Sequence, residues 1–222
     1  MHDCALGNVG GQFPGRLIGR LGSFSNGPGA AVESAINFTG QIRHNGWMAG
    51  FGAAPLLTIA DVNQFSGPEF VERVGWVFEQ SPWVAERVSA RRPFRSIDDL
   101  HIEMVATVLE ASREEQLALL RAYPDLGTRA RMSDSAAWEQ ASAGLDQLSP
   151  EAFDRLSRLN AAYQQKFGFP FLFAAKGSTS QEIMRALERR LACPIETEFQ
   201  EALRQVFRIA RFRLEELIGP GI

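Results

Sequence analysis

The chain has 222 residues, of which 45% are hydrophobic and 22% are charged, proportions typical of a globular protein with a hydrophobic core. The net charge of -3 and the pI near 5.7 argue against a basic nucleic-acid-binding surface. No apolar run approaches the roughly 20 residues of a membrane span, so we expect neither nucleic acid nor membrane as a partner.

Residues 1–55 differ in composition from the rest of the chain. They hold 12 of the 20 glycines and only five charged side chains, without a sustained helical period. We expect them to be a poorly ordered, Gly-rich N-terminal extension, with residues 56–222 forming the folded domain. The segment from Cys4 to Val32 has arginine and serine but no acid, so organelle targeting stays open as an alternative to a dispensable tail.

From position 56 onward, apolar residues recur with a helical period, and caps and prolines mark the boundaries. Ser112 and Glu115 form a predicted capping box, and Pro124 should end that helix at Tyr123, because a residue before proline avoids the helical conformation. The pattern predicts eight or nine helices, over about 58–65, 67–78, 82–91, 97–111, 113–122, 135–148, 150–166, 180–191 and 195–218.

Other local signals refine this prediction. Ser81 and Ser180 are each expected to cap the helix that follows, while Leu109 and Phe153 are expected on the buried faces of theirs. Residues 167–173, with the sequence FGFPFLF, predict an extended buried segment, because glycine and proline interrupt the aromatic run. The sequence therefore predicts an all-α fold, a single compact bundle without paired strands.

The cysteines and histidines give little sign of a metal site. Cys4 and Cys193 stand at opposite ends of the chain, and the three histidines are scattered. This spacing indicates neither a disulfide framework nor a set of metal ligands, and it favours a reducing, cytoplasmic compartment.

Seven groups of residues carry a family resemblance between about positions 56 and 218. In chain order they are FEQSPWVAER at 78–87, RPF at 92–94, LLRAYPDL at 119–126, EQ at 139–140 with AGLD at 143–146, LN at 159–160, KFGFPF at 166–171 after Tyr163, and RL at 213–214. Together they resemble the OHCU decarboxylase family, which acts on 2-oxo-4-hydroxy-4-carboxy-5-ureidoimidazoline (OHCU).

The resemblance implies an activity as well as a fold. It implies cofactor-independent decarboxylation of OHCU to (S)-allantoin in urate catabolism, by a carboxy-lyase that is commonly a homodimer and could associate with other urate-pathway enzymes. The ring of this substrate can accept the electrons left by carbon dioxide, so the protein has only to hold the carboxylate, orient the ring and deliver a proton to one face.

Through the resemblance, eight residues are expected in the site. Tyr123 and Glu139 match catalytic positions, and the positions expected to contact substrate are Pro124, Ser135, Gln140, Phe169, Phe171 and Arg213. A guanidinium fork such as that of Arg213 suits a carboxylate or ureido oxygen. Without the resemblance, the Arg213, Glu139 and Gln140 side chains would be interpreted as solvated helix residues and the two phenylalanines as core.

Two positions depart from the family pattern. Tyr123 replaces the usual histidine, and Ala136 replaces a serine, with Ser135 one place earlier. A tyrosine with an ordinary pKa of about 10 can donate a proton at neutral pH but does not readily accept one. The sequence thus leaves two main hypotheses: a decarboxylase that uses Tyr123 as an acid, or a catalytically silent homologue that binds a ureide or a protein. An unrelated helical regulator is disfavoured, because no basic recognition helix is present.

Overall fold

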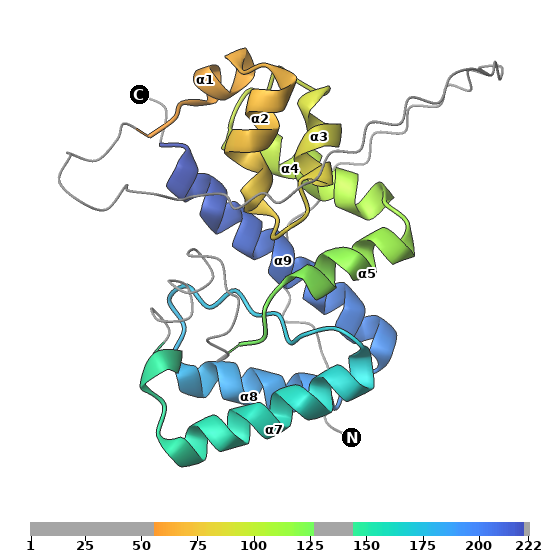
Figure 1. Ribbon diagram of the computed structural model, residues 1–222, viewed down its shortest axis with the longest axis vertical. Coiled ribbons are helices and arrows are strands. Elements are labelled where there is room, and N and C mark those ends of the chain that lie inside the picture. Colours follow the sequence, from red (N-terminus) through yellow and green to blue (C-terminus); the bar gives the residue numbers. More distant parts are fainter. Residues whose placement is uncertain (1–55, 127–143, 220–222) are drawn as a thin grey trace, which may run out of the picture. The chain divides into compact units, whose positions relative to one another are not determined.

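The computed structural model describes residues 56–126 and 144–219, and these ranges are helical (Figure 1). They contain eight α-helices, two short 3-10 turns and a single bridge between Leu57 and Ile218. The predicted all-α class is confirmed. Within the same ranges, no helix is both long enough and apolar enough to span a membrane. The predicted glycine-rich extension at 1–55 lies outside the described residues.

Three short helices open the described chain: α1 (Ile59–Gln64), α2 (Gly67–Val74) and α3 (Trp83–Ser89). Between α2 and α3 runs a 3-10 turn, η1 (Gly75–Val77). Caps of the expected kind fix the first two helices, because Thr58 forms a capping box with Asp61 and Ser66 accepts from the backbone of α2.

Two longer helices follow, α4 (Ile97–Glu110) and α5 (Arg113–Ala122). The predicted capping box of Ser112 and Glu115 is present at the start of α5. Tyr123 ends this helix in an extended conformation, with ψ 142°, as expected for a residue before proline.

The C-terminal half contains η2 (Leu145–Gln147), α7 (Pro150–Phe167), α8 (Ser180–Leu191) and α9 (Ile195–Leu217). Gly168 ends α7 in the left-handed conformation, with φ 77°, which glycine adopts without strain. Phe167 is the last residue of α7, whereas residues 168–173 are non-helical and mostly buried, so the predicted non-helical segment is confirmed from position 168 onward. We call residues 168–173 the FPF segment.

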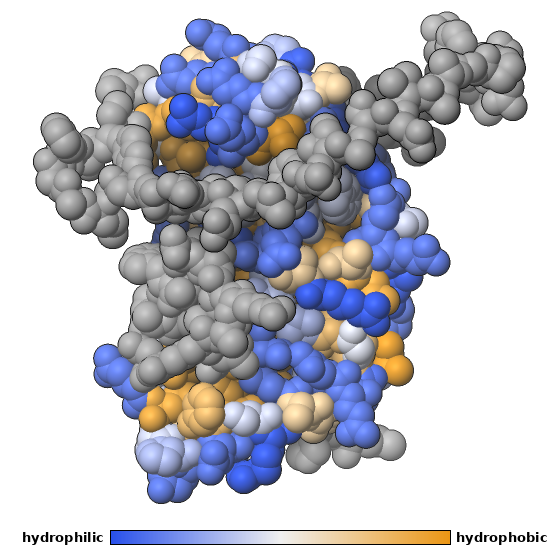
Figure 2. Space-filling view, viewed as in Figure 1, coloured by the Kyte–Doolittle hydropathy of each residue, from blue (hydrophilic) through white to orange (hydrophobic). Residues whose placement is uncertain are grey.

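Helix α9 organises the core. It packs against α4, α5, α7 and η1, and in Figure 1 it runs from the α7–α8 pair to the helices of the N-terminal half. Its buried face includes Phe199, Leu203, Val206, Ala210 and Leu214, as the helical period predicts. Figure 2 shows hydrophilic side chains over most of the described surface on this side, with smaller hydrophobic areas between them.

Several local predictions are wrong. Pro82, not Ser81, occupies the N-cap position of α3, and no side chain caps that helix. Thr179 rather than Ser180 caps α8, because its spacing to Glu182 completes a capping box. Gly144 is left-handed, with φ 71°, and a 3-10 turn follows it, so the helix expected over 135–148 does not extend through 145–148.

Two burial predictions also fail. Leu109 is 54% exposed, because it lies about 100° around α4 from the buried Val108. Phe153 is 45% exposed and lines a surface cavity at the first turns of α7 instead of joining the core.

Candidate active site

Arg213 projects from the inward face of α9 into the core. Only 1% of it is exposed. Its Nη1 donates to Oε2 of Glu79 at 3.0 Å and makes longer contacts with the carbonyl oxygens of Trp76 at 3.5 Å and Val77 at 3.4 Å. A guanidinium is costly to bury without an opposing carboxylate, so the ion pair with Glu79 helps to stabilise this buried position.

The neighbouring arginines of α9 behave differently. Arg204 and Arg208 are exposed, and Arg211 pairs at the surface with Asp98 and with Glu215. The interpretation of Arg213 as one more solvated helix arginine therefore does not hold. Burial singles it out among the arginines of this helix.

Tyr123 lies next to Arg213, although the two residues are far apart in the sequence. Tyr123 is 6% exposed, and the Cζ atom of Arg213 lies 5.8 Å from the centre of its ring. This distance is within the range of a cation–π interaction. The extended backbone at the end of α5 turns Tyr123 inward, so the structure brings together the two predicted site residues with the clearest chemistry. Pro124, which follows, is half-buried.

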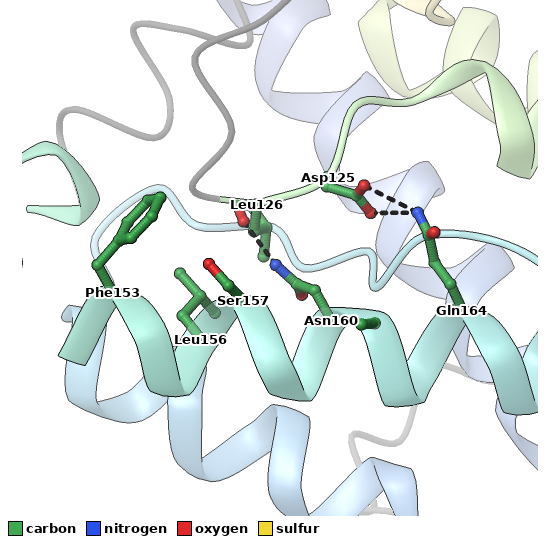
Figure 3. Close-up of a pocket in the computed structure, with 8 residues that line it drawn as sticks. Asp125, Leu126, Phe153, Leu156, Ser157, Asn160 and Gln164 are labelled. Carbon is green, nitrogen blue, oxygen red and sulfur yellow. Dashed lines mark hydrogen bonds between the residues drawn. The ribbon is translucent and has the colours of Figure 1, made fainter. Parts of the chain in front are cut away.

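The segment after Tyr123 is tied to α7 by side-chain amides (Figure 3). Gln164 donates to both carboxylate oxygens of Asp125, and Asn160 donates to the carbonyl of Leu126. The pKa of Asp125 is raised above its usual value, because the effect of burial outweighs the opposing effect of the hydrogen bond from Gln164. A cavity of about 180 Å³ lies along these residues, and Phe153 and Leu156 also line it.

The FPF segment begins close to the same place. Nε of Arg121 on α5 donates to the carbonyl of Gly168 at 2.8 Å. Because Arg121 is two residues before Tyr123 and Gly168 is one residue before Phe169, this bond from a side chain to a backbone carbonyl joins the two predicted site segments. The rings of Phe169 and Phe171 are buried against Tyr163, in edge-to-face contacts with centroids 6.0 and 5.3 Å away. Both rings are therefore core side chains.

A buried polar network holds the FPF segment from behind. Arg190 of α8 donates through Nε and Nη2 to the carboxylate of Glu198 on α9, and through Nη1 to the carbonyl of Leu172 at 2.7 Å. Tyr163 of α7 donates its hydroxyl to the same carboxylate. The Arg190 guanidinium also lies 4.6 Å from the centre of the Phe171 ring. Three helices are thereby connected to one extended segment.

Three predicted site residues, Ser135, Glu139 and Gln140, lie outside the described residues. Their roles stay predictions. In the ranges that the structure covers, no cluster of three or more His, Cys, Asp or Glu side chains could hold a metal ion.

Sequence reasoning missed the acids that pair with the buried arginines. Glu79 and Glu198 are 5% and 1% exposed, which is unusual for glutamate without a partner. Glu79 stands inside the FEQSPWVAER motif, next to the buried Phe78. Its place in this family motif was the one signal in the sequence that could have indicated a role for this acid. Its partner, 134 positions away, has no local signature.

Comparison with known proteins identifies the family. The family model described as OHCU decarboxylase matches residues 63–215, most of the chain and nearly all of the helical region. The chain belongs to the OHCU decarboxylase family. The match includes all eight residues that the resemblance assigned to the site.

Individual relatives agree with this family assignment. A 2-oxo-4-hydroxy-4-carboxy-5-ureidoimidazoline decarboxylase of Halalkalicoccus jeotgali is 49% identical over 164 residues, which are 74% of this chain and 93% of the relative. The uric acid degradation bifunctional protein PucL of Bacillus subtilis is 45% identical over 73% of this chain, but only 33% of PucL is covered. The crystal structure of an (S)-allantoin synthase superposes with a TM-score of 0.61 at 30% identity, covering 73% of this chain and 54% of that one.

Proposed function

We propose that this protein decarboxylates OHCU to (S)-allantoin in urate degradation, as its relatives' names describe. The observation that carries the proposal is the burial of Arg213 beside Tyr123 in a chain of this family. A cationic fork and a phenol in a site protected from water suit a substrate that carries a carboxylate and must be protonated on one face.

The proposed reaction uses no cofactor. The bond between the ring carbon and the carboxylate breaks, carbon dioxide leaves, and the electron pair is delocalised into the conjugated C=N and C=O groups of the ring. Arg213 holds the substrate by charge-assisted hydrogen bonds, and Tyr123 donates the proton that the ring carbon receives. Glu139 and Gln140 orient the ureido group and the ring in this proposal, and Ser135 contributes a hydroxyl.

The two aromatic residues of the FPF segment have a supporting role in this proposal. Because the rings of Phe169 and Phe171 are packed in the core, contacts with the substrate would come from their backbone N–H and C=O groups. Pro124 forms part of the wall. We also propose a cytoplasmic homodimer that associates with other urate-degrading enzymes, and the bifunctional architecture of PucL supports that association.

The test is circular dichroism of OHCU, generated in the cuvette from urate, with and without the protein. A decarboxylase gives fast appearance of the (S)-allantoin signal, whereas spontaneous decay gives a slow racemic product. The Tyr123→His variant belongs in the same experiment, because histidine both accepts and donates protons near neutral pH, and a positioned acid–base group contributes about 10² to 10⁴ in rate.

The two forms separate the hypotheses. A slow wild type that histidine accelerates identifies Tyr123 as the position of the proton donor, in a weakened site. A fast wild type that histidine does not improve indicates a site rearranged around the phenol. If both forms stay folded and neither exceeds the spontaneous rate, the decarboxylase proposal fails and a silent ureide- or protein-binding homologue takes its place.

A further inference from the structure

Glu79 is a buried acid at the candidate site to which the proposed reaction assigns no role. Its Oε2 lies 3.0 Å from Nη1 of Arg213, and 5% of the residue is exposed. We propose that Glu79 is a positioning residue that fixes the guanidinium of Arg213 for the decarboxylation, an inference that rests on the proposed function. Glu79 acts through Arg213 and does not itself touch the substrate.

The first support is that three acceptors of Nη1 among the described residues come from one short stretch of chain. Trp76 and Val77 contribute their carbonyl oxygens and Glu79 its carboxylate. They belong to η1 and the two residues after it, so they move together. A guanidinium is planar and rigid, so anchoring one nitrogen to such a group restricts the whole fork.

The second support is the backbone immediately after Glu79. Gln80 has φ 46°, and it is the only non-glycine residue with a positive φ among residues 56–126 and 144–219. A left-handed conformation is unfavourable for a residue with a Cβ and persists where the surrounding structure imposes it, often at functional sites. Here it lets the chain turn between the buried Phe78 and the buried Ser81, which keeps the Glu79 side chain directed inward.

The third support is the contrast with another arginine of α9, Arg211. Arg211 pairs with Glu215 at the surface, where 31% and 45% of the side chains are exposed. The pair of Arg213 and Glu79 is 1% and 6% exposed and lies beside Tyr123. Among the arginines of α9, Arg213 alone has a buried guanidinium, so the buried acid that pairs with it also restricts the direction of its fork.

If Glu79 positions Arg213, two substitutions of Glu79 should rank in one order of activity. If Glu79 only neutralises a buried charge, they should rank in the opposite order. Glu79→Asp keeps the charge but withdraws the carboxylate by one methylene, so Arg213 is displaced while the pair stays neutral. Glu79→Gln keeps the length and one acceptor but loses the charge. If Glu79 positions Arg213, Asp should be the less active variant and Gln the less stable one.

The experiment measures kcat/KM for (S)-allantoin formation and thermal stability on the full chain. A displacement of about 1 Å at a catalytic site can reduce the rate by about 100-fold, so we expect a loss of this order for Glu79→Asp with a melting temperature close to wild type. Activities are divided by the folded fraction from far-ultraviolet circular dichroism. Glu215→Gln, which removes the acid of the neighbouring surface pair, is the matched control and should leave kcat/KM unchanged.

A double-mutant cycle completes the test. In an Arg213→Ala background, Glu79→Asp should cause no further loss beyond about twofold, because a residue that acts through Arg213 has nothing left to position. A Glu79→Asp variant as active as the wild type, or one that loses activity equally with and without Arg213, overturns the inference while the proposed function stands. A wild type without activity overturns both.

Discussion

The buried network of Arg190, Glu198 and Tyr163 gives a prediction that separates stability from function. Arg190 makes bonds from Nε and Nη2 to Glu198 and from Nη1 to the carbonyl of Leu172, and all three network residues are almost completely buried. Burial, which outweighs the opposing effect of Arg190, raises the pKa of Tyr163, so its phenol stays protonated and donates to Glu198. We consider replacing Arg190 alone, and replacing all three residues with apolar ones.

Arg190→Met leaves the Glu198 carboxylate, 1% exposed, without its cation. Breaking a buried pair in this way costs about 3–5 kcal/mol. For a domain of this size, each kcal/mol corresponds to about 2–4 °C, so the melting temperature should fall by roughly 6–20 °C. In the triple variant Arg190→Met, Glu198→Leu and Tyr163→Phe, no charge or hydroxyl remains to be compensated. Most of the lost stability should therefore return, because apolar replacement of buried ion pairs is often neutral or stabilising.

Activity should not return with stability. The triple variant still lacks the bond from Arg190 to the carbonyl of Leu172, which holds the FPF segment. We expect kcat/KM to stay well below the wild-type value. Urea unfolding at pH 7 measures the free energies, and circular dichroism of allantoin formation measures the rates.

Arg155→Met is the matched control, because Arg155 and Glu188 form an exposed pair that also joins α7 and α8. It should cost less than about 1 kcal/mol. The reasoning is refuted if Arg190→Met costs no more than this control, or if the triple variant is as unstable as the single one.

Two further predictions concern the rest of the chain. Burial lowers the pKa of His101, whose Nε2 lies 2.8 Å from the carbonyl of Phe207, so the unfolded chain binds a proton more readily than the folded one. The free energy of unfolding should therefore fall as the pH drops below about 6.5. Measured by urea unfolding, it should depend less steeply on pH in His101→Gln than in the wild type. Equal slopes for the two proteins between about pH 8 and 5.5 would contradict this. Deleting residues 1–55 should leave the domain folded and active, because the N-terminal end of the described chain is held within the domain itself: the backbone N–H of Leu57 donates to the carbonyl of Leu217. A large fall in melting temperature would count against this prediction.

The eight described helices and most of their ends could be predicted from local patterns, because they depend on neighbours within one turn. The capping box of Ser112 and Glu115 and the stop at Tyr123 before Pro124 are contacts or steric restrictions between residues a few positions apart. The family could also be inferred from sequence, since seven ordered segments match it. Where the local signal was ambiguous, as between Thr179 and Ser180, the prediction missed by one residue.

Local patterns could not predict which polar residues lie inside, because that depends on contacts between helices. Arg204, Arg208, Arg211 and Arg213 look alike in the sequence, yet Arg213 alone among them is buried. The difference comes from Glu79, 134 residues earlier, which reaches Arg213 because η1 packs against α9. A buried charge is tolerated only where a partner compensates it. The partner of Arg213 is 134 residues away, so the sequence pattern around either residue does not contain the other.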